Sequence, residues 1–523
     1  MVSNSDVLIV GAGPTGLALA IELQRLGVRH RCIDRSLQPV RFSQALAVQA
    51  RTLEQFERCG LSDKLIARGM MARRIEFFSD GAHAASMSFN GAPTRYPYVL
   101  VIPETATESI LEAHLNDLGG RVDRGVELAS CADVFDAAEA KLCHSSGKVE
   151  EIAARWIVGC DGAHSKVREA TGVEFSGETE PHHFWLADVE LTGPAVPTDE
   201  LQLHLHEGNA VFMARWAERT WRVVVALHGT PDAAAPTLVD IQRALDQFVG
   251  GGLTAANPAW LAPFQVNERK AERYQVGSLF LAGDAACIHS PVGGQGMNTG
   301  LQDAANLGWK LAAVLHGADP QLLQSYDEER GAVGAGVLRF ASRGLSAAMT
   351  DNLLLQAFRD FLAPHLTQLP IVQKAMLGFI SELAIHYRHS SIVRDGVDGG
   401  SLRAGDRAPN PDVHFRTRRG GRLLDQLKGG SHLALAVNVA NEEAVAHELH
   451  GVPLLFLATH PAGSIRAGWI DSDLEEFFGA APQIALVRPD GYIGFRGLEP
   501  DIDALENYAR TTGLPLLCSA RAA

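Results

Sequence analysis

Glycines spaced to bring the backbone close to a phosphate make up the chemically most informative segment of this sequence. Gly11-Ala-Gly-Pro-Thr-Gly16 follows the apolar residues 7–10, and the next apolar run ends at Asp34. Glycines at this spacing allow a tight turn, let a pyrophosphate approach the backbone and let a helix pack closely on a strand. The N–H groups at the start of that helix attract phosphate, and Asp34 can accept a hydrogen bond from a ribose hydroxyl. The segment predicts a dinucleotide site, for FAD or NAD; a glycine turn that serves packing alone is the alternative.

A second glycine-rich segment, Leu281–Gly300, predicts another place where negative charge is stabilised. Asp284 follows a strand predicted over residues 278–282, at the end where α/β sheets bind ligands. The loop glycines then precede a helix predicted over residues 298–312. A flavin offers a hydroxylated chain for Asp284 and, once reduced, an anionic ring for the start of that helix. The two segments together therefore predict bound FAD.

Three motifs in this order resemble those of the single-component (class A) FAD-dependent aromatic hydroxylases, a family of flavoprotein monooxygenases. They are Gly11–Gly16, Cys160-Asp-Gly-Ala-His-Ser165, and Gly283-Asp284 with Pro291-Val-Gly-Gly-Gln-Gly-Met-Asn298. The resemblance covers roughly residues 5–350. It implies an α/β fold: a Rossmann-like FAD-binding domain of the para-hydroxybenzoate-hydroxylase type with an inserted antiparallel β-sheet that forms the substrate domain.

The C-terminal part of the chain resembles one branch of this family. Ala404-Gly-Asp-Arg-Ala-Pro409 and Ile484–Phe495 are similar to segments of the thioredoxin-like C-terminal α/β domain of phenol and polyketide hydroxylases. Because this region has no cysteine before Cys518, dithiol chemistry is excluded there, and we expect a structural or subunit-contact role.

The resemblance also implies which residues hold the cofactor and line the reaction site. Asp34 would bind the ADP half of FAD, Asp284 the ribityl chain and the segment ending at Asn298 the pyrimidine edge. The Pro291 carbonyl would line the reaction site, and His289 beside it is the second catalytic candidate. The cofactor-binding set is Gly11, Gly13, Gly16, Asp34, Arg35, Arg41, Glu104, Asp161, Asp284, Gly294, Gly296, Met297 and Asn298.

Three positions depart from the family pattern. Asp34 replaces the usual Glu and is one methylene shorter, and Glu104 stands where a Gln is usual. Cys287 occupies a position often held by His, so no acid–base role is carried over to it.

Residues 182–228 alternate between apolar and polar side chains, which predicts an antiparallel sheet. Such a sheet beside a flavin would form a wall of the substrate pocket. The pattern does not indicate which face of the sheet points inward, so candidates come from both. The substrate-binding candidates are His204, Phe212, Arg215 and Arg222; a solvated outer position is the alternative for each.

The function that the resemblance implies is NAD(P)H-driven hydroxylation of a phenolic or polyketide-like aromatic substrate. FAD would be the bound cofactor, NADPH or NADH a transient co-substrate, and O2 would react through a flavin C4a-hydroperoxide. Epoxidation, Baeyer–Villiger insertion or oxidative decarboxylation by the same flavin chemistry remains open. A non-catalytic flavin-binding sensor or assembly protein is the alternative of another class.

The composition of the chain limits the classes of binding partner that we expect. The net charge of −15 argues against nucleic acid and against anionic membrane surfaces. The N-terminus shows no signal peptide, and the seven cysteines include no CxxC pair, which indicates a cytoplasmic protein without a metal site. The expected partner is a small aromatic substrate, and the expected state is a monomer or homodimer.

A chain of 523 residues calls for several domains. We expect long helices over residues 321–343 and 351–388, with the acids at positions 327–329 on a solvated face, and a linker over residues 394–411. The expected division is 1–180 and 271–350 for FAD binding, 181–270 for the substrate sheet, 351–395 for a helical connection and 396–523 for the thioredoxin-like domain.

Overall fold

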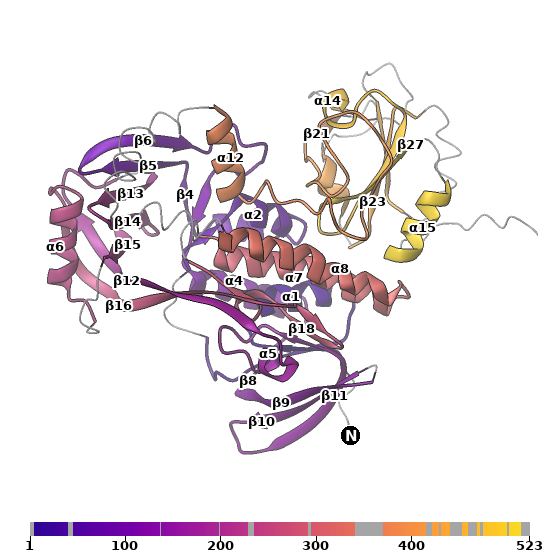
Figure 1. Cartoon of the computed structure of the whole chain (residues 1–523), viewed down its shortest axis with the longest axis horizontal. Coiled ribbons are helices and arrows are strands. Elements are labelled where there is room, and N and C mark those ends of the chain that lie inside the picture. Colours follow the sequence, from indigo (N-terminus) through magenta and orange to yellow (C-terminus); the bar gives the residue numbers. More distant parts are fainter. Residues whose placement is uncertain are drawn as a thin grey trace, which may run out of the picture. The chain divides into compact units, whose positions relative to one another are not determined.

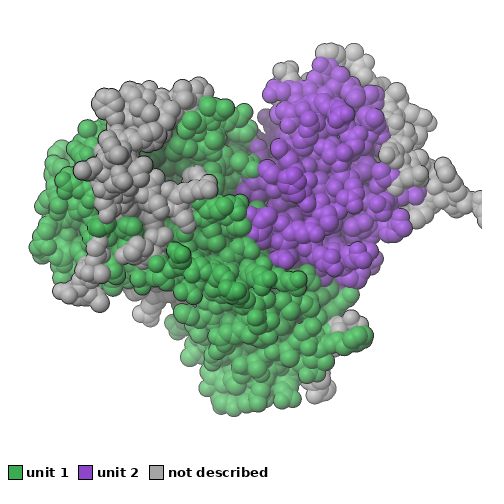
Figure 2. Space-filling model, viewed as in Figure 1, with its two compact units in different colours: residues 1–18, 31–302, 333–384 green, residues 19–30, 303–332, 385–523 purple. Residues whose placement is uncertain are grey.

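The computed structural model describes most of the chain and divides it into two compact units (Figure 2). Unit 1 comprises residues 1–18, 31–302 and 333–384, and unit 2 comprises residues 19–30, 303–332 and 385–523. The described residues are 5–39, 45–135, 137–197, 199–228, 235–290, 294–339, 370–414, 421–427, 430–439, 452–458, 468–470, 474–498 and 502–513.

The first sheet of unit 1 is built on parallel strands, and its central strand β1 is mostly apolar. Val7, Leu8 and Ile9 are fully buried, as expected for a strand covered on both faces. The last residue of β1, Val10, lies beside Gly159 of β11, which in turn lies beside Leu281 of β18. The strands in spatial order are β17 (Gln275–Val276), β18 (Leu279–Leu281), β11 (Val149–Gly159), β1 (Ser5–Val10), β2 (His30–Asp34) and β8 (Val122–Arg124), with β10 (Ala137–His144) and β9 (Val126–Val134) continuing from β11.

The second sheet of unit 1 is the antiparallel sheet that the alternating pattern predicted. Helix α6 (Leu238–Phe248) covers one of its faces and packs on Val211, Met213 and Val223 (Figure 1). Its strands in order are β19 (Cys287–Ile288), β16 (Thr254–Ala271), β12 (Phe175–Thr192), β15 (Thr220–Leu227), β14 (Asn209–Arg215), β13 (Glu200–His206), β5 (Arg74–Ser79) and β6 (Ala82–Ser88).

Unit 1 also contains a small third sheet. It consists of β3 (Ala47–Val48), β7 (Val99–Val101) and β4 (Met70–Ala72), with β7 in the middle. Helices of unit 1 include α2 (Ala50–Glu57), α3 (Ser62–Ile66), α4 (Glu104–Asp117), α5 (Lys166–Thr171) and α12 (Pro370–Ile380); α1 (Pro14–Arg25) and α7 (Gly296–Leu315) contain residues of both units. The helix expected over 351–388 ends at Ile380, and its part before Pro370 lies outside the described residues.

Unit 2 contains a mixed sheet whose central strand β23 is buried on both faces. The hairpin predicted at Pro489-Asp-Gly491 joins two antiparallel strands, β26 and β27, as expected. The helix expected over residues 442–449 lies outside the described residues. The strands in order are β20 (Arg394–Asp395), β27 (Ile493–Leu498), β26 (Gln483–Val487), β23 (Leu433–Val437), β24 (Leu454–Ala458), β25 (Gly468–Ile470), β21 (Asp412–His414) and β22 (Gly421–Arg422), and the helices include α14 (Leu474–Phe478) and α15 (Ile502–Thr512).

Residues 394–411 do not behave as the linker that their Gly, Asp and Pro content suggested. Ala404 and Ala408 are buried in the core of unit 2, and Asp395 accepts a hydrogen bond from the Ala404 N–H at 2.9 Å. Turn-forming residues here fold onto the sheet because the small alanines among them fit its core.

Two expectations for residues 321–343 are met only in part. The described part of this segment is helical but not uniformly α-helical: it begins as a 3-10 turn, η2 (Pro320–Leu323), passes through α8 (Gln324–Tyr326) and a π-helical turn, η3 (Asp327–Gly331), and continues as α-helix over residues 332–339. Glu329 does not face solvent: its side chain is fully buried and forms ion pairs with Lys310 at 2.8 Å and with Arg488 at 2.7 Å. Two buried cations, rather than water, therefore stabilise the negative charge of the Glu329 carboxylate.

Candidate active site

The three sequence motifs meet because they follow the carboxyl ends of three neighbouring parallel strands. β1 leads into Gly11, β11 into Cys160 and Asp161, and β18 into Gly283 and Asp284 (Figure 1). The carboxyl ends of parallel strands lie at one edge of a sheet, where open α/β folds bind their ligands.

The glycines of the first motif serve two different purposes. A Cβ at Gly11, whose φ is +100°, would overlap the carbonyl oxygen of Cys160, and a Cβ at Gly16 would overlap the carbonyl oxygen of Gly11. Both are therefore required by packing within the protein. A Cβ at Gly13 would meet no atom closer than Glu108 Oε1, at 3.8 Å. The bare backbone at Gly13 thus leaves room for a ligand, which fits the pyrophosphate of a dinucleotide.

Asp34 is held at the mouth of this turn. Its two carboxylate oxygens accept hydrogen bonds from the backbone N–H groups of Ala12 and Ser36, each at 2.8 Å. The shorter Asp side chain therefore fastens the end of β2 to the glycine turn. Arg35 beside it is exposed, and Arg41 lies outside the described residues.

Asp161 and Arg168 connect the second and third motifs. Asp161 Oδ2 accepts the Lys166 N–H at 2.7 Å, whereas its Oδ1 is buried and has no hydrogen-bond partner among the described residues. Burial raises the pKa of this carboxyl. The Arg168 guanidinium donates to the Ala285 carbonyl at 2.9 Å and to the Ala163 carbonyl at 2.6 Å. The sequence argument missed Arg168, although it lies three residues beyond the motif.

A group of carboxyls surrounds the place where the flavin would bind. Asp284 is exposed to solvent, yet desolvation by the protein around it, and secondly repulsion from Glu104, raise its pKa to about 6. Glu104 begins α4 and accepts the Ala45 N–H at 3.3 Å. Glu108, one helical turn further, is buried, and desolvation followed by repulsion from Glu104 raises its pKa to about 8. The spacing of four residues from Glu104 would have identified Glu108, which the sequence argument did not name.

The loop before α7 is fastened by the side chain of Asn298. Its Oδ1 accepts the Gln49 N–H at 2.8 Å, and its Nδ2 donates to the carbonyls of Ala47 at 2.9 Å and Gly294 at 2.8 Å. Asn298 is fully buried, so its side chain ties strand β3 to this loop rather than reaching outward. Any contact of Asn298 with a flavin would therefore use its backbone.

The start of α7 offers that backbone. The N–H of Thr299 donates to the Gln295 carbonyl at 2.8 Å, which is a bond of the first helical turn. The N–H groups of Gly296, Met297 and Asn298 come before it and have no acceptor within the helix. Together with the helix dipole, they suit the negatively charged edge of a reduced flavin ring.

His289 points its free ring nitrogen toward the same helix start. Its Nδ1 donates to the Ser290 carbonyl at 3.0 Å, while Nε2 is buried without a hydrogen-bond partner among the described residues. A Cβ at Gly296 would lie 3.8 Å from the His289 ring. Burial lowers the pKa of His289, so the ring is neutral and Nε2 carries a lone pair. Pro291, the other catalytic candidate, lies outside the described residues.

The four substrate-binding candidates do not lie together. Phe212 and Arg222 lie on one face of the antiparallel sheet, and the Arg222 guanidinium binds both oxygens of Asp188 at 2.9 and 2.8 Å. His204 lies opposite Val211 on the face that α6 covers, stacks on Phe78 at 4.3 Å and has its pKa lowered to about 4 by burial.

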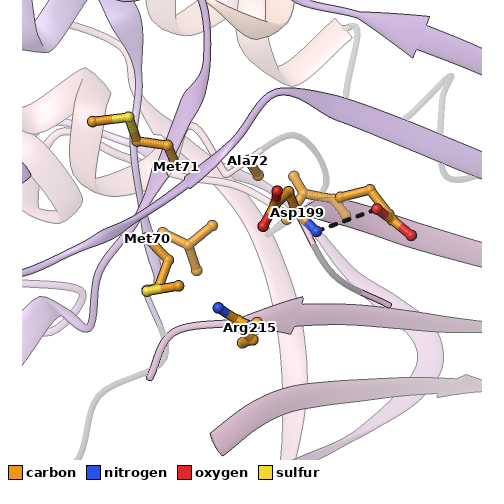
Figure 3. A pocket seen from close by; sticks show the side chains of 8 residues that line it. Met70, Met71, Ala72, Asp199 and Arg215 are labelled. Carbon is orange, nitrogen blue, oxygen red and sulfur yellow. Dashed lines mark hydrogen bonds between the residues drawn. The ribbon is translucent and has the colours of Figure 1, made fainter. Parts of the chain in front are cut away.

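Arg215, the fourth candidate, lines a small hollow between the antiparallel sheet and the small sheet (Figure 3). The hollow is lined by Met70, Met71, Ala72, Val101, Asp199, Glu200, Leu201 and Arg215.

Two classes of feature are absent from the part of the chain that the structure describes. No group of three or more His, Cys, Asp or Glu side chains there could hold a metal ion. No helix there has the length and apolar character needed to cross a membrane.

Comparison with known proteins identifies the family. Residues 4–341 match the family model described as an FAD binding domain. The chain is 34% identical over 531 residues to 12-dehydrotetracycline 5-monooxygenase/anhydrotetracycline 6-monooxygenase of Streptomyces rimosus, covering 97% of this chain and 98% of that one. It is 33% identical over 483 residues to rifampicin monooxygenase of Streptomyces venezuelae, covering 91% and 98%.

A solved structure agrees with these matches. The anhydrotetracycline hydroxylase OxyS of Streptomyces rimosus superposes with a TM-score of 0.78 at 29% identity, over 98% of this chain and 100% of that one. The similarity thus extends through the C-terminal region as well as the cofactor-binding part. The chain belongs to the class A FAD-dependent aromatic hydroxylases and is an FAD-dependent monooxygenase.

Proposed function

We propose that this enzyme hydroxylates a phenolic or polyketide-like aromatic ring, with NADPH or NADH as transient electron donor and O2 as oxygen source. The observation that carries the proposal is that three neighbouring parallel strands end at the sequence motifs and that α7 begins close to Gly283, with first N–H groups that have no acceptor within the helix. Two relatives are named as monooxygenases of 12-dehydrotetracycline and anhydrotetracycline and of rifampicin, and these names support a polycyclic substrate.

The residues of this edge would hold FAD as follows. Gly13 and the start of α1 would take the pyrophosphate, Asp34 and Arg35 the adenosine half, and Asp284 the ribityl chain. Arg41, Glu104 and Asp161 would complete the site, and the backbone from Gly294 to Asn298 would contact the pyrimidine edge. When bound, FAD would supply the transfer of electrons from NAD(P)H to O2 and of one oxygen atom to the substrate.

His289 would accept the proton of the substrate hydroxyl at its Nε2. This nitrogen is buried and has no hydrogen-bond partner among the described residues, and the opposite nitrogen is fixed by the Ser290 carbonyl. Removing the proton raises the electron density of the ring, which favours attack on an electrophilic oxygen. The Pro291 carbonyl would lie next to it on the same loop, and apolar side chains of the small sheet would exclude water.

In this proposal residues 1–180 and 271–350 bind FAD, 181–270 form the substrate-binding sheet, 351–395 connect them to the C-terminal part, and 396–523 have a structural role. The described cysteines form no disulfide, which fits a reducing cytoplasm. We expect a monomer or a homodimer.

The test uses purified protein, its visible spectrum, and NADPH and O2 consumption with a panel of phenols and polycyclic phenols. The proposal expects a flavin spectrum, consumption stimulated by at least one aromatic, and a product that carries one atom of oxygen from labelled O2 as a ring hydroxyl. Labelled oxygen in an epoxide or a lactone would redirect the proposal to another oxygenation. A flavin that no nicotinamide donor reduces would contradict it.

A further inference from the structure

Glu108 of α4 is a buried carboxyl without a partner in the described part of the chain. Its residue is only 8% exposed, and its side chain forms no hydrogen bond or ion pair with any described residue. Buried polar groups in folded proteins are almost always hydrogen-bonded, and each exception calls for an explanation. A ligand that accepts a hydrogen bond from this carboxyl would supply the partner that the protein does not.

The carboxyl lies beside the glycine that leaves room for the pyrophosphate. Glu108 Oε1 is the atom nearest to the position that a Cβ would take on Gly13, at 3.8 Å. Gly13 and the start of α1 come from the first motif, whereas Glu108 comes from a helix far along the chain. The fold therefore places a buried carboxyl oxygen at the edge of the space that a bare backbone keeps open.

The charges that face Glu108 favour its neutral form. They are the carboxyls of Glu104 and Glu112 on the same helix, Asp34 at the end of β2, and the guanidinium of Arg124 on β8. Arg124 already donates to both oxygens of Glu112, at 3.2 and 2.7 Å. Desolvation, followed by repulsion from Glu104, raises the pKa of Glu108 to about 8. The carboxyl therefore carries its proton at neutral pH.

A neutral carboxyl is also the form that suits a pyrophosphate at Gly13. An ionised carboxylate beside the phosphate charges would be repelled by them in a poorly solvated place. A protonated carboxyl has an O–H that donates, and a hydrogen bond to a charged acceptor is stronger than one to a neutral acceptor.

We infer that Glu108 is a cofactor-binding residue whose protonated carboxyl donates a hydrogen bond to a phosphate oxygen of FAD. The proton stays on Glu108, and no covalent bond to the cofactor changes. Because the bond holds this proton in place, binding of FAD is linked to protonation of Glu108. The inference concerns the cofactor alone and does not depend on which substrate is oxidised.

The inference has a definite consequence for the pH dependence of FAD binding. As the pH rises through about 8, Glu108 of the FAD-free protein loses its proton, whereas the FAD-bound protein holds the proton more tightly. FAD binding should therefore be constant around neutral pH and weaken at higher pH, by up to about tenfold per pH unit. Between pH ~7.5 and pH ~9.5 we expect the dissociation constant to rise about tenfold or more.

The first test titrates FAD into the full-length protein from which FAD has been removed, with flavin fluorescence as the signal. Glu108→Gln keeps a donor that does not titrate, so it should bind FAD nearly as well as the wild type at pH ~7.5 and lose the pH dependence. Glu108→Ala removes the donor and should bind about tenfold more weakly at the same pH. Glu112→Gln makes the same change one helical turn further along, at a carboxylate paired with Arg124, and should keep the dependence of the wild type.

The second test measures the proton itself. Calorimetric titration with FAD at pH ~8.5, in two buffers of different ionisation enthalpy, should show that the wild type and Glu112→Gln take up part of a proton. Glu108→Gln should take up none. A wild type without proton uptake, or a Glu108→Gln variant with the pH dependence of the wild type, would overturn the inference. Both measurements omit NADPH and substrate, so a failure of the proposed hydroxylation is recorded separately, by NADPH and O2 consumption.

Discussion

Gly13 and Gly16 belong to one turn but are constrained by different neighbours. Because a Cβ at Gly13 meets no protein atom closer than 3.8 Å, Gly13→Ala should leave the melting temperature of the FAD-free protein unchanged. Its methyl group would instead occupy the approach of the pyrophosphate and weaken FAD binding about tenfold or more. Gly16→Ala should destabilise the FAD-free protein itself, because its Cβ would overlap the Gly11 carbonyl. Thermal unfolding and flavin content distinguish the two, and a Gly13→Ala protein with normal FAD affinity would contradict this assignment.

Glu108 should make stability depend on pH. Its pKa is raised to about 8 in the folded protein, from an ordinary value of 4.5, so the folded state holds this proton more tightly than the unfolded chain. The stabilisation is complete below the unfolded pKa and is lost as the pH rises through the folded pKa. Relative to Glu108→Gln, the FAD-free wild type should therefore lose at most about 5 kcal/mol of unfolding free energy between pH ~4.5 and pH ~8.

Urea unfolding of both proteins across this pH range measures the difference. Glu112→Gln, one turn further along α4, is the control, since its carboxylate is paired with Arg124 at 2.7 Å. This variant should not reproduce the dependence. A constant difference between wild type and Glu108→Gln would show that Glu108 titrates alike in both states.

At the residue scale, the sequence predicted the positions of residues that belong to a local sequence motif. Gly11, Gly16 and Asp284 lie where expected because a strand, a turn and a helix determine them locally. Arg168 was missed because one of its two acceptors, the Ala285 carbonyl, belongs to a distant segment. Glu108 was missed because its burial is a tertiary property, although its spacing from Glu104 was a local signal.

At the scale of elements, the cross-strand pair of Asp188 and Arg222 gives Arg222 a structural task. Both side chains are less than 10% exposed, and they bond in a bidentate manner between β12 and β15. Arg222→Met should lower the unfolding free energy by about 3–5 kcal/mol, because it leaves the buried Asp188 carboxylate without its cation and with the Trp216 indole N–H as donor. Asp188→Leu combined with Arg222→Met should restore most of this loss. A double variant no more stable than the single one would show that the pair is not coupled.

The same strands mark the limit of predicting a site from periodicity. Alternation correctly predicted the antiparallel sheet, since successive side chains point to opposite faces. Alternation does not indicate which face of the sheet is covered. Helix α6 packs on the face that carries His204, and Phe212 lies on the opposite face. Because α6 follows the strands in the sequence, the face on which it packs is determined by tertiary structure. Arg215 is the candidate that lines the small hollow, and its Nε has no hydrogen-bond partner among the described residues.

At the scale of the whole molecule, the order of the segments was predictable, but the sequence did not indicate which charged side chains are buried and paired. The run of acids at 327–329 has the composition of a solvated helix face. Its last member, Glu329, instead joins Lys310 of α7 and Arg488 before the hairpin of β26 and β27, all within unit 2. Such a cluster brings together charges separated by more than a hundred residues, and burial of each depends on the presence of the others.

This cluster should make unit 2 sensitive to the loss of one charge. Glu329→Gln would leave the fully buried Lys310 without a carboxylate partner among the described residues and Arg488 with Asp490 alone, and should cost about 3–5 kcal/mol of unfolding free energy. Glu328→Gln is the matched control: it makes the same change at the adjacent, exposed residue, and an amide oxygen can still accept the Ser391 N–H that Glu328 accepts at 2.8 Å. Calorimetry should therefore show an unfolding transition lowered by Glu329→Gln and nearly unchanged by Glu328→Gln. Equal effects of the two variants would mean that water, rather than the neighbouring cations, stabilises Glu329.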